Sequence, residues 1–222
     1  GRMGAAASVL LFLVLAGACL DDAFIPKSLI PSSTTSSTGL IERLTLSAMK
    51  ILPARRVREV ISYSVAGSDP PVFYIDTPEK KVALTFDISW GDTRAEPILQ
   101  VLKEKGVQKA TFFLSSPWSR NHPDIVRKIV EAGYEIGSHG HKHVNYSRLS
   151  DEEIRTQIRT AHDILTELTG SPPRLIRMPN GDFDKRVLRI AHELNYTVIQ
   201  WDTDSLDWKN PGVDRIIDRA LA

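Results

Sequence analysis

The feature that most constrains this chain is a regular alternation of strand-like and helix-like segments that begins near Lys81. Short runs rich in apolar residues predict strands at Val82–Phe86, Ala110–Leu114, Tyr134–Ile136, Leu175–Ile176 and Thr197–Trp201. Amphipathic segments and helix boundary signals predict helices at Ala95–Lys105, Pro123–Ala132, from the capping box Ser150–Glu153 onward, at Asp184–Leu194 and at Val213–Leu221. This spacing predicts parallel β-α units, hence either an α/β barrel or a doubly wound sheet.

Unusual polar residues follow these strands directly. Asp87 follows the first strand, a cluster from Ser138 to His143 follows the third, and Arg177 and Asn180 follow the fourth. The last strand is followed by Asp202, Asp204, Asp207 and Trp208. Both candidate folds place functional loops at the C-terminal ends of their strands, so we expect these side chains to converge on one rim.

The histidine cluster is the sharpest local signal. His139, His141 and His143 alternate within a segment that contains Gly137 and Gly140, which give the backbone freedom. Imidazoles at His139 and His143 can close on one divalent cation and leave open positions for water and substrate. A solvated basic loop is the other interpretation of this segment, and a carboxylate at a neighbouring strand end favours the metal.

Four motifs in order resemble those of the polysaccharide deacetylases, the NodB homology domain of carbohydrate esterase family 4. They are TFD at Thr85–Asp87, H-x-x-x-H at His139–His143, R-x-P-x-G at Arg177–Gly181 and D-x-x-D-W at Asp204–Trp208. The resemblance extends from about Lys81 to Ala222. The variant TFDISWGD and the preceding YSVAG and FYIDT are similar to the sporulation-associated branch of Gram-positive bacteria.

The resemblance implies an α/β fold of the distorted (β/α) barrel type. It also implies a hydrolase that acts on carbon–nitrogen bonds other than peptide bonds and removes N-acetyl groups from amino sugars of cell-wall polysaccharide. Peptidoglycan is the expected substrate, sporulation the expected setting, and a divalent metal, zinc first, the expected cofactor.

The resemblance further implies a role for each matching residue. Asp87 matches the general base and Arg177 the residue that pairs with it, where charge attraction is expected to keep the base ionised. The remaining matches are His139 and His143 as metal ligands, Asp207 as a carboxylate that tunes a catalytic histidine, Pro179 and Asn180 beside the oxyanion, and Trp208 as a wall of the acetyl pocket.

Position 88 departs from the family pattern, because the resemblance implies a second aspartate there as the third metal ligand and this chain has Ile88. Either Asp87 turns toward the metal, or Asp92 reaches in, or the site is metal-poor; Asp92 is equally interpretable as the N-cap of the following helix. The alternative function is therefore a non-catalytic wall-binding or spore-assembly protein. An Ile88→Asp change is expected to raise both metal uptake and acetate release.

The ends of the chain give the remaining expectations. The family's last motif, which carries a catalytic histidine, is not found before Ala222, so we expect the domain to be truncated at its C-terminus. Residues 1–22 contain an apolar run and predict a signal peptide or single membrane anchor, with lipidation at Cys19 left open. Residues 23–39 predict a flexible Ser/Thr-rich linker, 40–76 a lead-in segment, and 77–222 the deacetylase domain.

The protein is thus expected to be anchored to the membrane on the extracytoplasmic side. A net charge of +1 gives no global attraction to nucleic acid.

Overall fold

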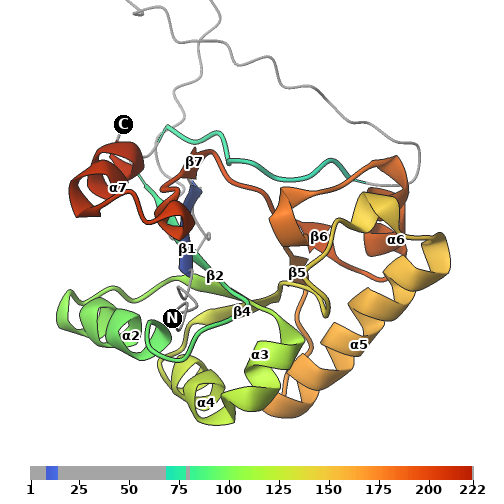
Figure 1. Cartoon of the computed structure of the whole chain (residues 1–222), viewed down its shortest axis with the longest axis horizontal. Helices are drawn as coiled ribbons and strands as arrows, with labels where there is room; N and C mark the ends of the chain where they lie inside the picture. Colours follow the sequence, from blue (N-terminus) through green and yellow to red (C-terminus); the bar gives the residue numbers. More distant parts are fainter. Residues whose placement is uncertain (1–8, 15–68, 79–80, 222) are drawn as a thin grey trace, which may run out of the picture. The chain divides into compact units, whose positions relative to one another are not determined.

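The computed structural model describes residues 9–14, 69–78 and 81–221, and for 9–14 it describes the backbone alone. The sheet has seven strands in the order β6-β5-β4-β3-β2-β1-β7 (Figure 1). Strands β2 to β6 run parallel to one another, whereas β1 is antiparallel to both β2 and β7. The strands are β1 Val9–Val14, β2 Ala83–Ile88, β3 Thr111–Leu114, β4 Glu135–Ser138, β5 Leu175–Ile176, β6 Thr197–Val198 and β7 Thr203–Asp204.

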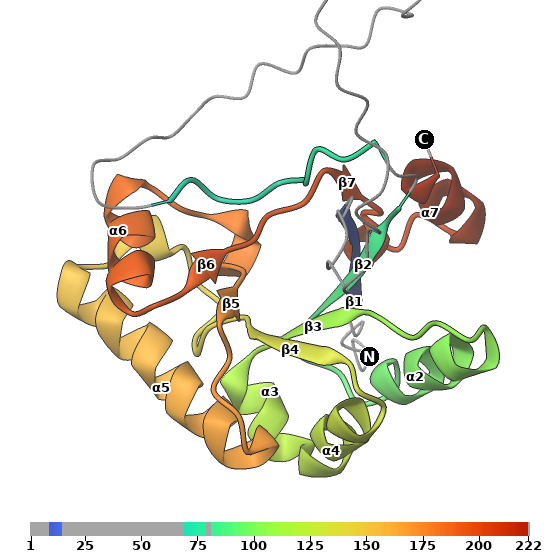
Figure 2. The ribbon, with the colours of Figure 1, turned by 180° about the vertical axis from the view of Figure 1, so that it is seen from behind.

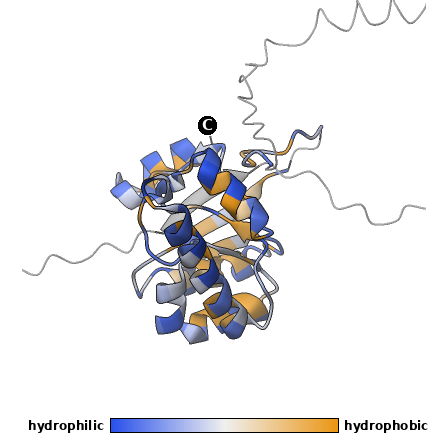
Figure 3. Ribbon diagram, turned by 90° about the vertical axis from the view of Figure 1, so that its right-hand side faces the viewer, coloured by the Kyte–Doolittle hydropathy of each residue, from blue (hydrophilic) through white to orange (hydrophobic). Residues whose placement is uncertain are grey.

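Helices α2 to α6 lie around the outside of this sheet (Figures 1 and 2). Both blue and orange residues occur along them in Figure 3, as expected for helices with one buried face. The helices are α2 Ala95–Glu104, α3 Ser116–Asn121, α4 Pro123–Glu131, α5 Asp151–Thr169, α6 Lys185–Glu193 and α7 Val213–Ala220, with 3₁₀ turns η1 Tyr146–Arg148, η2 Pro179–Gly181 and η3 Asp207–Lys209.

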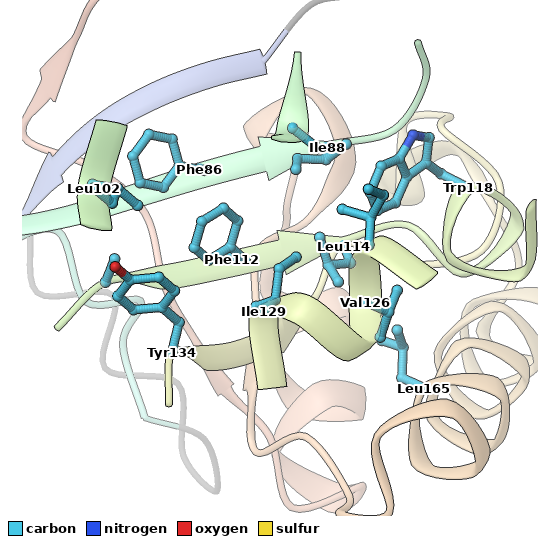
Figure 4. Close-up of a cluster of buried hydrophobic side chains, with 13 residues drawn as sticks. Phe86, Ile88, Leu102, Phe112, Leu114, Trp118, Val126, Ile129, Tyr134 and Leu165 are labelled. Atoms are coloured by element: carbon cyan, nitrogen blue, oxygen red, sulfur yellow. The ribbon is translucent and has the colours of Figure 1, made fainter. Parts of the chain in front are cut away.

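The two faces of strand β2 carry different kinds of side chain, apolar on one face and polar on the other. Because successive side chains of a strand point to opposite sides, Phe86 and Ile88 lie on the face that packs under α2 to α4, whereas Thr85 and Asp87 lie on the other. Figure 4 shows Phe86 and Ile88 among the side chains of this apolar cluster. A second cluster packs α5 and α6 against the far end of the sheet, around residues such as Ile176. The face that carries Asp87 is thereby left for polar chemistry.

The predicted α/β class is confirmed, as is the parallel order of the strands from residue 81 onward. The Ser150–Glu153 capping box is present at the start of α5, with both of its hydrogen bonds. The sequence did not indicate α3, and β6 is shorter than the predicted Thr197–Trp201 strand. The described strands form an open series with β6 and β7 at its ends, so the barrel form stays a prediction.

Much of the predicted N-terminal organisation lies outside the described residues. Of the predicted anchor 1–22, only Val9–Val14 is described, and its backbone pairs antiparallel with β2 from Val9↔Ile88 to Val14↔Ala83. The linker 23–39 is not described, and the lead-in 40–76 is described only from residue 69. Residues 69–78 pass from the β6 end of the sheet toward β2 (Figure 2). Within the described part of the chain, no helix has the length and apolar character needed to cross a membrane.

Candidate active site

Five of the predicted residues line one pocket of about 540 Å³, which contains Asp87, His139, His143, Asn180 and Trp208. Asp87 lies near the end of β2, and His139 directly follows β4. Since β2, β3 and β4 are parallel, their carboxyl ends meet at one edge of the sheet, which brings residues 52 positions apart in the chain to the same pocket. The expected convergence on one rim is therefore seen for these five residues.

Asp87 in the pocket lining belongs to a buried ion pair. Arg177 Nη1 donates to Asp87 Oδ1 at 2.8 Å, and the two side chains are 0% and 2% exposed. The same guanidinium donates to Thr85 Oγ1 at 2.9 Å and to the carbonyl of Gln200 at 2.8 Å. Its Cζ lies 4.2 Å from the centroid of the Phe113 ring. These contacts fix the direction in which the second oxygen of Asp87 points.

The charge state of Asp87 reflects a competition between burial and its arginine partner. Burial raises the pKa of Asp87 to about 6, although the positive charge and hydrogen bond of Arg177 lower it. Arg177 thus favours the ionised form as expected, but removal of the carboxylate from water outweighs this attraction and sets the upward direction of the net shift. The resulting pKa suits a base that works near neutral pH.

His139 is held as a neutral imidazole with one free lone pair. Its Nδ1 lies 2.7 Å from the carbonyl oxygen of Arg177, which accepts only an N–H, so the proton is on Nδ1. Burial lowers the pKa of His139 to about 4. Its Nε2 is buried and has no hydrogen-bond partner among the described residues, the nearest carboxylate oxygen being Asp87 Oδ2 at 3.9 Å. The lone pair on His139 Nε2 is therefore free to bind a ligand such as a metal ion or a hydrogen-bond donor.

The turn between the two predicted ligands depends on Gly140. It has φ of 73°, and a Cβ there would lie 2.2 Å from the Tyr146 hydroxyl oxygen. This turn places the ring of His143 with its centroid 5.3 Å from that of His139. Burial also lowers the pKa of His143 to about 4, so both imidazoles are neutral at pH 7.

The two imidazoles could hold a divalent cation, and the unpaired Nε2 of His139 suits a ligand atom. The third ligand that the family resemblance implies is absent, because position 88 is isoleucine. Across residues 69–78 and 81–221, no group of three or more His, Cys, Asp or Glu side chains is arranged to hold a metal. The described residues therefore do not complete the set of three protein ligands that such a metal site requires.

Ile88 is part of the apolar core. Its side chain is 1% exposed, and Figure 4 shows it in the same cluster as Leu114 and Trp118, which packs under the helices. This follows from strand alternation, since Asp87 occupies the opposite face of β2. The substitution thus fills the core as well as removing a ligand.

Asp92 takes neither of the roles that the sequence suggested. Its Oδ1 lies 3.0 Å from His122 Nε2, and its side chain is 83% exposed. The residue at the start of α2 is Arg94, which makes no side-chain capping bond. Asp92 is therefore not the N-cap, and it is not among the residues that line the pocket. Its contact depends on α3, the helix that the sequence did not reveal.

Three of the predicted site residues are absent from the pocket lining. Arg177 lies behind Asp87, to which it is bonded. Asp207 accepts a hydrogen bond from Ser205 Oγ at 2.8 Å at the start of η3, and its role in tuning a histidine stays a prediction. Pro179 is buried at the start of η2, beside the turn at Gly140. It supports Asn180, which has φ of 60° and whose Nδ2 donates to Asn145 Oδ1 at 2.7 Å.

Trp90 and Trp201 also line the pocket, together with Asp204, and sequence reasoning assigned no site role to Trp90. Trp90 is 40% exposed and meets the ring of His143 edge-on, with centroids 5.0 Å apart. The signal that could have identified it is an aromatic side chain three residues after Asp87, in a loop that follows a strand. Trp90, Trp201 and Trp208 give the pocket flat apolar walls.

Comparison with known proteins identifies the family of this chain. The sequence model of a family described as polysaccharide deacetylase matches residues 74–199. A peptidoglycan-N-acetylglucosamine deacetylase of Bacillus cereus is 38% identical over 141 residues, which are 64% of this chain and 51% of that protein. The uncharacterized protein YlxY of Bacillus subtilis is 32% identical over 154 residues, 69% of this chain and 48% of that protein.

A solved structure of similar fold comes from a protein described as a pseudoenzyme. It is a mutant of BA3943, "a CE4 family pseudoenzyme with restored enzymatic activity", whose wild type is from Bacillus anthracis. The TM-score is 0.63 at 33% identity, covering 68% of this chain and 56% of that one. This chain spans about half the length of the curated relatives it matches. Since the family match takes in more than half of the 222 residues, the chain belongs to the polysaccharide deacetylase family.

Proposed function

We propose that this protein removes N-acetyl groups from amino sugars of cell-wall polysaccharide, with peptidoglycan as its substrate and Asp87 as its base. The observation that carries the proposal is the buried Asp87–Arg177 pair, whose carboxylate lines a pocket with tryptophan walls. The names of relatives support the choice of substrate, since they include peptidoglycan deacetylases of Bacillus cereus and of Listeria monocytogenes.

In the proposed reaction, Asp87 accepts a proton from a water molecule as the water oxygen attacks the carbonyl carbon of the acetamide. The C–N bond then breaks as the proton held by Asp87 passes to the sugar nitrogen, which leaves as a free amine. This transfer restores the carboxylate form of the base for the next turnover, and the other product is acetic acid, which ionises to acetate. Arg177 holds Oδ1 of Asp87, so the base presents Oδ2 to the pocket. We assign the backbone N–H of Asn180 to the developing oxyanion, following the family resemblance.

The indole walls account for recognition of the sugar. Trp90 and Trp208 are 40% and 47% exposed, which is unusual for such large apolar side chains and suits surfaces that a ligand covers. Pyranose rings have apolar C–H faces that pack on aromatic rings. Trp201 lies deeper, next to Gly181, and closes the end of the pocket.

A second candidate is glycan binding without hydrolysis. It is favoured by Ile88, which occupies the position of the implied third metal ligand and is buried in the core. The likeness to a protein described as a pseudoenzyme supports the same candidate. Under this candidate the pocket walls keep their function, whereas Asp87 and Arg177 serve only to stabilise the fold.

Acetate release separates the two candidates. The full-length protein would be incubated with peptidoglycan and with N-acetylglucosamine oligomers, and acetate would be quantified for the wild type and for Asp87→Asn. Asp92→Asn is the matched control, since it makes the same chemical change outside the pocket. Loss of about 10²–10⁴-fold in Asp87→Asn, with Asp92→Asn unchanged, supports hydrolysis. Oligomer binding without acetate release by the wild type supports the second candidate.

We also propose that the protein is attached to the membrane and faces the cell wall, and that it acts during sporulation. The apolar composition of residues 1–22 supports the attachment, which requires Val9–Val14 to leave its pairing with β2, and a wall substrate requires an outside location. Membrane fractionation, followed by protease treatment of intact cells, tests the location. A deletion strain assayed for spore formation and wall acetylation tests the setting.

A further inference from the structure

A second hollow adjoins the pocket and has a different chemical character. It has a volume of about 570 Å³ and shares His143 and Asn180 with the pocket. We call it the outer hollow and define it by Lys142, His143, Asn145, Arg148 and Asn180. The hydrogen bond from Asn180 to Asn145 joins the wall of the pocket to the wall of the outer hollow. A glycan held in the pocket by one sugar can therefore continue into this space.

The outer hollow presents two cations, Lys142 and Arg148, whose side chains are exposed. Among the described residues, neither cation has a carboxylate oxygen within 4.0 Å. Glu153 also lines the hollow, but its Oε2 accepts from the backbone N–H and the hydroxyl of Ser150, both at 2.8 Å. These bonds hold the carboxylate at the start of α5, where it keeps its negative charge and interacts with the charge of Lys142. Two cations and one anion among the lining residues leave the hollow with an excess of positive charge.

The backbone that carries Arg148 is fixed on both sides. Ser147 donates through its N–H and its hydroxyl to Asp182, at 2.7 and 2.9 Å. Arg186 donates to the carbonyls of Ser147 and Leu149, at 2.9 and 3.2 Å. Hydrogen bonds on both sides of Arg148 thus fix the backbone of the turn η1. The guanidinium of Arg148 therefore projects from a well-defined backbone position.

We propose that the outer hollow is a second subsite, which binds a carboxylate carried by the sugar next to the one in the pocket. A guanidinium and an ammonium beside an amide suit a carboxylate, because arginine can accept it with two parallel hydrogen bonds. The subsite selects an acidic glycan, such as one with lactyl or peptide carboxylates, over a neutral one. This inference rests on the proposed function and names the substrate class for the same pocket.

The test compares two soluble tetrasaccharides of equal length by titration calorimetry with the full-length protein. One is the neutral N-acetylglucosamine tetramer, and the other alternates N-acetylglucosamine with N-acetylmuramic acid that carries free lactyl carboxylates. An exposed ion pair raises affinity by up to about fivefold. With two cations in the outer hollow, we expect the acidic tetramer to bind roughly three- to tenfold more tightly than the neutral one. This preference should shrink when the salt concentration is raised.

The variant Lys142→Gln/Arg148→Gln should lose the preference and keep its affinity for the neutral tetramer. Lys105→Gln/Arg127→Gln is the matched control, because it removes the same charge from exposed positions that do not line the outer hollow. Three results overturn the subsite: equal wild-type affinities for the two tetramers, a preference that survives in Lys142→Gln/Arg148→Gln, or an equal loss of the preference in the control. Absence of binding and of acetate release with both tetramers overturns the proposed function as well, so the two failures are distinguishable.

Discussion

The Ile88→Asp change tests whether side chain 88 belongs to the core or to the pocket. In the structure Ile88 is 1% exposed in the apolar cluster, on the face of β2 opposite Asp87. Loss of a buried isoleucine costs about 1.5–3 kcal/mol of transfer free energy. A carboxylate left in its place is desolvated without a partner, which costs roughly a further 3 kcal/mol or protonates the group. We therefore expect the free energy of unfolding to fall by about 4–6 kcal/mol, a large share of the roughly 5–15 kcal/mol typical of a domain.

Urea unfolding followed by tryptophan fluorescence measures this change, in metal-free buffer and with zinc added. Ile88→Asn separates shape from charge, and Ile88→Leu keeps the volume and should cost less than about 1.5 kcal/mol. Burial raises the pKa of the new carboxyl in the folded state, so its excess cost over Ile88→Asn is present above that folded pKa. The excess disappears as pH falls below the unfolded value, where both states bind the proton.

A metal-free Ile88→Asp protein that unfolds within about 1 kcal/mol of the wild type would refute this reasoning. The side chain at position 88 would then face the pocket, and the sequence-based expectation of increased metal uptake and acetate release would hold. Stabilisation of this variant by zinc, without effect on Ile88→Asn, would locate the new carboxylate at the imidazoles of His139 and His143.

Three further predictions concern the pocket itself. Arg177→Met removes the partner of buried Asp87 and should lower the free energy of unfolding by about 3–5 kcal/mol. In the double variant Arg177→Met/Asp87→Asn, the loss of unfolding free energy should be smaller than the sum of the losses in the two single variants. Chemical denaturation measures both. Trp90→Ala should weaken binding of N-acetylglucosamine oligomers by roughly fivefold, about 1 kcal/mol, while Trp90→Phe keeps most of the affinity in calorimetry. Gly181→Ala should change the near-ultraviolet circular dichroism and reduce oligomer affinity, because its φ is 64° and a Cβ would lie 2.3 Å from Trp201 Cη2; an unchanged spectrum would contradict the packing described here.

The sequence predicts those parts of the structure that depend on local pattern or on the rule for strand ends. The capping box at Ser150 is a four-residue signal, and the structure contains it. Asp87, His139 and His143 meet because parallel strands end at one edge, which requires only that the strands be identified. The sequence also contains the signal for the core position of Ile88, because Leu84, Phe86 and Ile88 alternate with Thr85 and Asp87 along the strand.

Other features depend on three-dimensional context that the sequence does not supply. The pKa of Asp87 reflects the depth of its burial, and pairing with Arg177 alone suggested the opposite direction. The partner of Asp92 is His122, which lies between α3 and α4, 30 positions away in the chain. An uninterrupted apolar run such as Val9–Val14 has no period that separates a strand from a helix, so β1 could not be read from it.

The guanidinium of Arg177 joins parts of the chain that are remote in sequence. It bonds to Thr85 and Asp87 on β2 and to the carbonyl of Gln200 beyond β6, at sequence separations of 92, 90 and 23 residues. The guanidinium therefore connects an inner strand of the sheet, β2, with the segment that follows the end strand β6. The orientation of the proposed base is thus coupled to the docking of a segment more than 100 positions further along the chain, because loss of the contact at residue 200 removes one of the bonds that hold the guanidinium beside Asp87.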